Sequence, residues 1–108
     1  MKQYFKSVSS ACSKTFIKVT DEMPDYVNDV YKNGEYLHIT HQIFSAVDDD
    51  SGRNWVDLRI SKFVVKKEEF ELQKKVYLYI EISESEYTRA EHKLREYIQK
   101  FKSEIVNL

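Results

Sequence analysis

The chain has 108 residues, a length that suits one ordinary domain with a single hydrophobic core, so we expect residues 1–108 to form one folded unit. Hydrophobic residues make up 42% and charged residues 32% of the chain, which is too apolar for an intrinsically disordered protein and too polar for a membrane protein. The net charge of −1 lacks the positive excess of proteins held on duplex DNA chiefly by charge. A single cysteine, Cys12, excludes an intrachain disulfide and paired thiolate zinc sites.

The N-terminal segment is locally basic and its conformation is open. Tyr4, Phe5 and Val8 fit a helical stripe, while the serines around them equally suit a strand. Residues 14–20 predict a strand, because Ile17 and Val19 alternate with polar residues. The basic residues of this part of the chain, with no acid before Asp21, are Lys2, Lys6, Lys14 and Lys18.

A short helix is predicted next. The segment from Asp21 to Pro24 has acids and a proline where a helix begins, and Asn33 with Gly34 is typical of a helix end.

The centre of the chain predicts three strands. Residues 35–44 and 56–61 alternate apolar and polar side chains across a polar turn at 48–54, which predicts a hairpin. Phe63 and Val65 break the alternation, so we expect a bulge near Lys62. A charged connector over 66–75 and a third alternating strand over 76–82 follow.

The C-terminal segment predicts one long helix. Ser83 with Glu86 three residues later forms a capping-box pattern at its start. One apolar stripe follows the spacing of a helix, formed by Tyr87, Ala90, Leu94, Ile98, Phe101 and Ile105. The predicted fold is therefore α+β: an antiparallel sheet of three to four strands, covered on one face by a short helix and the long C-terminal helix.

Patterns for catalysis and metal binding are weak in this sequence. The turn Asp48-x-Asp50-x-Gly52 lacks the glycine and the glutamate that a calcium loop places further on. His38 and His41 are three apart on a predicted strand and would point to opposite faces. We therefore expect no catalytic residue, no metal ligand, no cofactor and no enzymatic activity.

The strongest candidate for a binding surface is the polar face of the predicted sheet. By strand parity this face carries aromatic, cationic and hydroxyl side chains, a mixture that is enriched in protein interfaces and that also suits stacking on nucleobases. The candidate binding residues are Tyr36, His38, Trp55, Arg59, Tyr77 and Tyr79. The alternative is that the N-terminal segment or a second copy, in a homodimer, covers this face.

We expect a small protein-binding module in the cytoplasm, since the chain has no long apolar run and no signal-peptide pattern. The excess of Lys, Ile, Tyr and Phe over Gly, Ala, Arg and Pro is typical of AT-rich coding. It suggests an accessory or inhibitory protein, of the anti-defence type, from a phage or mobile element of a low-GC bacterium. The second hypothesis is a single-stranded nucleic-acid-binding protein that uses the same tyrosines with Arg59 and the N-terminal lysines.

Overall fold

The structure is a computed structural model that describes the backbone of residues 1–10, 13–48 and 54–106 and the side chains of residues 1–7, 14–43, 59–93, 95, 96 and 99. Five strands form one sheet in the order β4-β3-β2-β1-β5, and every neighbouring pair is antiparallel. The elements are β1 (Lys2–Ser10), β2 (Ser13–Thr20), the 3₁₀ turn η1 (Asp29–Tyr31), β3 (Tyr36–Asp48), β4 (Asn54–Lys66), α1 (Lys67–Val76), β5 (Ile80–Ile82) and α2 (Glu84–Val106).

The pairing register gives all five strands the same parity. Tyr4 lies opposite Lys18, Lys18 opposite Thr40, and Thr40 opposite Lys62. Even-numbered residues therefore meet even-numbered residues, except at the irregular end of the β1–β2 pair, where Ser10 lies opposite Ser13. Because residues directly opposite each other in a sheet share a face, even-numbered strand residues lie on one face and odd-numbered ones on the other.

Helix α1 covers part of the odd-numbered face, which we call the α1 face. Its one buried residue, Phe70, is 1% exposed and packs edge-on against Phe5, with ring centroids 5.6 Å apart. The apolar core of this face consists of Phe5, Ile17, Val19, Leu37, Ile39, Val65 and Phe70. All the strand residues among them are odd-numbered, which accounts for their common burial under one helix.

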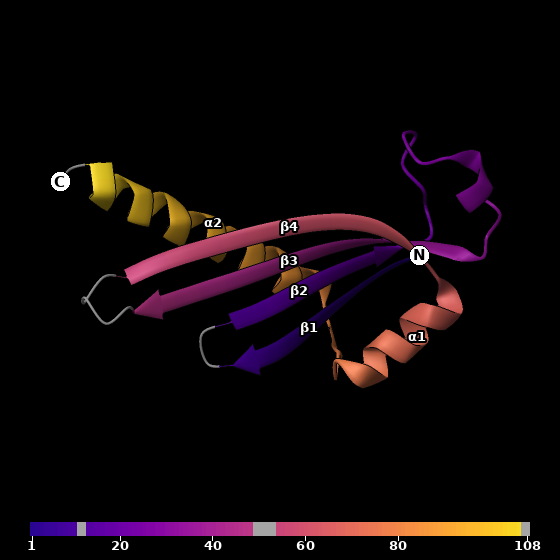
Figure 1. Cartoon of the computed structure of the whole chain (residues 1–108), viewed down its shortest axis with the longest axis horizontal. Coiled ribbons are helices and arrows are strands. Elements are labelled where there is room, and N and C mark those ends of the chain that lie inside the picture. The colour runs from indigo at the N-terminus through magenta and orange to yellow at the C-terminus, as the bar shows by residue number, and fades with distance from the viewer. Residues whose placement is uncertain (11–12, 49–53, 107–108) are drawn as a thin grey trace.

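Helix α2 covers part of the even-numbered face, which we call the α2 face. Tyr87 packs against Tyr4 with ring centroids 5.0 Å apart, and its hydroxyl accepts a hydrogen bond of 2.9 Å from the buried Gln42 side-chain amide. In Figure 1, α2 crosses behind the strands, while α1 lies at the end of the sheet that carries the N-terminus. The contacts therefore place α1 and α2 on opposite faces; α1 is not the short helix that the sequence predicted over 21–33.

The α+β class, the antiparallel sheet and the long C-terminal helix are confirmed. The predicted cap of α2 is also present, since the Glu86 amide donates a 3.1 Å hydrogen bond to Ser83 Oγ. The N-terminal segment, left open by its sequence, forms strand β1 over Lys2–Ser10.

Four local predictions are wrong. The helix expected before Gly34 is reduced to the single turn η1, and Val30 stays exposed. Residues 67–76, expected as a connector, form α1, whereas the strand expected over 76–82 is only β5. The bulge expected near Lys62 is absent along the described pairing of β3 with β4, which continues unbroken between Tyr36 opposite Lys66 and Asp48 opposite Asn54.

The change of apolar parity in β4 therefore has another cause. Val65 is odd-numbered and is buried beneath α1, while Ile60 is even-numbered and lies opposite Gln42, the residue that contacts α2. The apolar positions change face along the strand because the helix that covers the sheet changes. The backbone remains regular.

Replacing Phe70 with alanine should lower the free energy of unfolding by about 3–5 kcal/mol, because a fully buried aromatic side chain leaves a cavity. Phe70→Leu should cost a smaller part of this. The matched control is Leu72→Ala on the same helix, where the side chain is 62% exposed and the cost should stay within about 0.5 kcal/mol. Urea unfolding followed by circular dichroism measures all three, and equal costs at 70 and 72 would contradict the assignment of the core.

Candidate functional site

The sheet register divides the six candidate binding residues between the two faces. Tyr36 and His38 are even-numbered and lie on the α2 face, whereas Arg59 lies opposite Ile43 on the α1 face. The Trp55 side chain lies outside the described part of the structure. The single platform expected from sequence is therefore absent among the described residues, because the unbroken β3–β4 pairing puts Arg59 on the side opposite to Tyr36.

Tyr36 and His38 are engaged with the segment that precedes β3. The Tyr36 ring packs edge-on against Tyr31, with centroids 5.0 Å apart. His38 is buried, and its Nε2 lies 3.0 Å from the Tyr26 hydroxyl. These two contacts hold the segment from 21 to 35 over its end of the α2 face, which is the end seen at the upper right of Figure 1. Neither residue offers an open surface of the kind predicted.

Tyr77 and Tyr79 come together on the α1 face, although neither belongs to a strand. Tyr77 is the C-cap of α1, and the two rings are stacked at 24° with centroids 6.0 Å apart. Tyr79 packs by its other contacts against Phe5 and Phe70, with centroids 6.3 and 6.2 Å away. Tyr79 is thus fixed by the core, while Tyr77 stands beside it and is 59% exposed.

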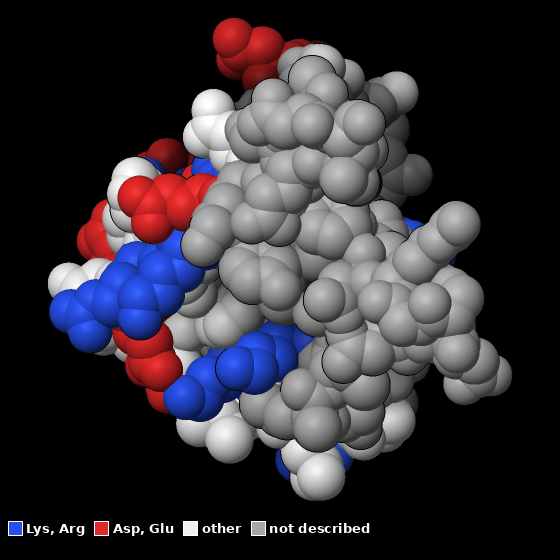
Figure 2. All heavy atoms as spheres, turned by 90° about the vertical axis from the view of Figure 1, so that its left-hand side faces the viewer, with Lys and Arg blue, Asp and Glu red and all other residues white. Residues whose placement is uncertain are grey.

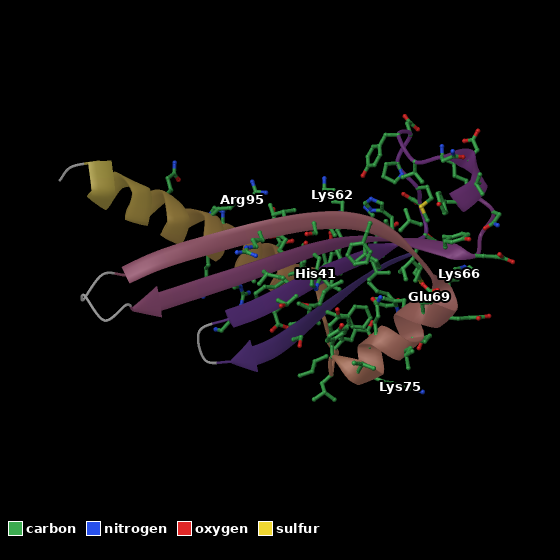
Figure 3. All side chains as sticks on the ribbon, in the orientation of Figure 1. His41, Lys62, Lys66, Glu69, Lys75 and Arg95 are labelled. Atoms are coloured by element: carbon green, nitrogen blue, oxygen red, sulfur yellow. The ribbon has the colours of Figure 1, made fainter. Side chains whose placement is uncertain are left out.

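A groove of about 530 Å³ lies between these tyrosines and the uncovered part of the α1 face. Its volume falls within the range of small-ligand pockets, about 300–1,000 Å³. The lining side chains are neutral or aromatic: Ser7, Thr15, His41, Ser61, Phe63, Gln73, Tyr77 and Tyr79. We refer to it as the α1-face groove. Figure 3 labels His41, which lies midway along the sheet.

Two contacts shape the groove. The Ser7 hydroxyl donates a 2.8 Å hydrogen bond to the backbone carbonyl of Tyr77, which ties the end of α1 to β1. His41 meets Phe63 edge-on with centroids 6.3 Å apart, as expected for two residues on adjacent strands of one face. Burial lowers the pKa of His41 below its ordinary value, so its imidazole is neutral at pH 7 and the groove carries no charge from it.

An exposed apolar surface adjoins the groove. It consists of side chains that are more than half exposed at the end of α1 and in the residues that lead to β5: Leu72 (62%), Val76 (63%), Tyr77 (59%) and Leu78 (77%). We call this set the α1–β5 patch. The alternation over 76–82 predicts a strand with Val76, Leu78 and Ile80 on its buried face. This period of two gives no sign that the three side chains are exposed.

Leu78 adopts a backbone conformation that is rare for its residue type. Its φ is +54°, in the left-handed region. The Tyr77 amide donates to the Gln73 carbonyl (2.9 Å) and the Tyr79 amide to the Lys74 carbonyl (3.0 Å), the bonding expected where a helix closes through one left-handed residue. Glycine is the usual residue there, because a side chain in this conformation costs roughly 1–2 kcal/mol.

The structure also separates the tyrosines from the N-terminal lysines. Lys2, Lys6, Lys14 and Lys18 are even-numbered and lie on the α2 face, while the tyrosine pair lies on the α1 face. The predicted combination of tyrosines, Arg59 and lysines on one surface is therefore wrong in its geometry. Figure 2 views the left-hand side of Figure 1 and shows basic and acidic side chains next to one another in its coloured part.

Within the part of the chain whose residues are described, no group of three His, Cys, Asp or Glu side chains is arranged to hold a metal ion. The turn at 49–53 and Cys12 lie outside that part. No described helix is long and apolar enough to cross a membrane.

The folded protein should lose stability as the pH falls below about 6.5, the ordinary pKa of histidine. Burial lowers the pKa of both His38 and His41, and the charges of Lys62 and Lys18 lower that of His38 further. The unfolded chain therefore takes up protons before the folded one, so the histidine contribution is complete above pH 6.5 and is lost below it.

Urea unfolding midpoints at pH 7.5 and 5.5 measure this loss of stability. In the variant with His38→Gln and His41→Gln, the midpoint should fall by less between the two pH values. An unchanged difference between the two pH values in that variant would contradict the assignment. NMR titration of the two imidazoles reports the lowered pKa values directly.

No protein family model, no curated protein and no solved structure matches this chain. The chemistry of the site therefore rests on the residues described above.

Proposed function

We propose that the protein is a non-enzymatic protein-binding module that contacts its partner through the α1–β5 patch and the α1-face groove. Leu78 is the observation that carries the proposal. A leucine in the left-handed region destabilises the folded state relative to glycine, and at 77% exposure it gains little from burial. A contact between the Leu78 side chain and a binding partner would offset this cost.

The surroundings of Leu78 support a protein partner. Solvent-exposed apolar groups that adjoin one another are typical of sites where soluble proteins bind each other. Tyr77 and the groove behind it add a neutral, partly aromatic hollow, and a hollow of this kind accepts an apolar or aromatic side chain of a partner. The patch lies at the end of α1, next to the edge strand β5, so a partner can reach it without opening the sheet.

The composition of the chain supports a narrower proposal about the kind of protein-binding module. We propose an accessory or inhibitory protein of the anti-defence type, encoded by a phage or mobile element of a low-GC bacterium. Its support is the composition typical of AT-rich coding and the size of one small domain. Identifying the genes adjacent to the coding sequence tests this origin.

Replacing Leu78 with glycine should affect stability and binding in opposite directions. The free energy of unfolding should rise by about 0.5 kcal/mol, because relief of the left-handed strain exceeds the extra entropy of glycine in the unfolded chain. Binding should weaken about tenfold or more, as expected when a central apolar contact of more than ~1.4 kcal/mol is removed. Urea unfolding and calorimetric titration of the purified partner measure the two effects.

A matched pair of valines provides the control for the position of the surface. Val76 and Val30 are 63% and 66% exposed, but only Val76 belongs to the patch. Partners should first be captured from the cells in which the chain is expressed, then purified and titrated against each variant. Val76→Ser should weaken binding and Val30→Ser should leave it unchanged; equal effects of both, or of neither, would contradict this surface.

A further inference from the structure

The lysines of the strands gather on the α2 face. All six are even-numbered, and the register therefore puts Lys2, Lys6, Lys14, Lys18, Lys62 and Lys66 on one side of the sheet. The effect on a neighbour agrees with this placement, since the charges of Lys62 and Lys18 both lower the pKa of His38 on the same face. A chain with a net charge of −1 thus concentrates its strand lysines on one side.

A cleft of about 320 Å³ lies on this face between α2 and the strands β1 and β2. Its lining comes from two strands and from one stripe of α2 whose residues follow helical spacing: Lys6, Ser7, Lys14, Phe16, Glu86, Arg89, Ala90 and Lys93. Four of these side chains are cationic and one is acidic. Phe16, which is half-buried, supplies the aromatic surface of the cleft.

The charges in the cleft are only partly compensated. Lys6 Nζ lies 2.8 Å from Glu86 Oε1 and forms an ion pair with it. Among the residues whose side chains are described, no acidic group forms an ion pair with Lys14, Arg89 or Lys93. Three cations in one small hollow therefore have no ion-pair partner among the described side chains, and an anion placed there would relieve their mutual repulsion.

We propose that this cleft binds the phosphodiester backbone of a single-stranded nucleic acid, with one base against Phe16. Arginine and lysine are the side chains that contact phosphate oxygens, and an aromatic ring among them suits stacking of an unpaired base. An acidic peptide would also satisfy the cations, but its carboxylate side chains would not stack on the ring as a nucleobase does. A single strand can place an unstacked base against Phe16, whereas the bases of a duplex are stacked on one another.

The cleft shares one lining residue, Ser7, with the α1-face groove, and its other lining residues differ from those of the surface proposed for protein binding. It lies on the α2 face, whereas the tyrosine pair of the groove packs against the core of the α1 face. A partner protein and a nucleic acid could therefore be held at the same time. Leu78→Gly should leave the affinity for nucleic acid unchanged, so failure of one proposal can be distinguished from failure of the other.

Fluorescence anisotropy with labelled ten-residue oligo-dT and oligo-U tests the cleft in the full chain. With three uncompensated cations, the slope of log affinity against log salt should be about −2, so the Kd should rise about 20-fold between 50 and 200 mM salt. The variant with Arg89→Gln and Lys93→Gln should reduce the slope to about −0.7. Arg89 and Lys93 are both exposed, and thermal unfolding verifies that the variant folds.

Two matched controls separate the cleft from net charge. Lys67→Gln with Lys75→Gln removes the same charge from α1 and should leave the slope unchanged; Figure 3 shows Lys75 pointing away from the sheet. Glu86→Gln frees Lys6 from its ion pair and should tighten oligonucleotide binding, while Glu68→Gln on α1 should not. A gain of affinity at position 86 alone is an outcome that general loss of acidity does not produce.

Three results would overturn the proposal. The first is that the oligonucleotides do not bind at 50 mM salt, or that their affinity does not change between 50 and 200 mM. The second is that the α1 and α2 double variants change the salt slope equally. The third is a poly-glutamate peptide that displaces the oligonucleotide at equal concentration of charge, because this would assign the cleft to an acidic protein segment instead.

Discussion

The long pairing of β3 with β4 determines the arrangement of the rest of the molecule. Both strands are 13 residues long and pair in register along their described length. Together with the pairings of β2 and β1, this ladder assigns odd-numbered strand residues to one face and even-numbered ones to the other, apart from the irregular pairing of Ser10 with Ser13. A shift by one residue would invert the faces of β4, so that Val65 would leave the core beneath α1. The register is therefore enforced by burial as well as by hydrogen bonds.

The two faces differ in the kind of core that they carry. Beneath α1 the core is apolar, and Phe70 closes it. Beneath α2 the described contacts are aromatic and polar: Tyr4 packs on Tyr87, and Gln42 donates to the Tyr87 hydroxyl. Burial raises the pKa of both tyrosines, which keeps the two phenols neutral next to the acids of α2. Each helix covers only part of its face, and the uncovered remainder forms the α1-face groove on one side and the lysine-lined cleft on the other.

The sequence predicted elements whose burial pattern is simple and missed those whose pattern is sparse. Strands β2 to β4 and helix α2 have clear periods of two or of three to four. Helix α1 was missed because Phe70 is its only buried residue; its acidic first turn and basic last turn were the available signal. Leu78 and its neighbours alternate as a strand does, yet helix closure overrides that pattern. The candidate site was displaced for a similar reason, since Arg59 was assigned a face from apolar parity, and that parity changes between Ile60 and Phe63.

The assignment of residues to the two faces depends on the register of β3 with β4, and nuclear Overhauser contacts of the Phe63 ring measure this register. In the described pairing Phe63 lies opposite Ile39 and meets His41 at a centroid distance of 6.3 Å. We expect contacts from the Phe63 ring to the side chains of Ile39 and His41. Contacts to Thr40 and His38 in their place would mean that the strand has slipped by one residue, and the α1-face groove, which Phe63 lines, would then be wrong.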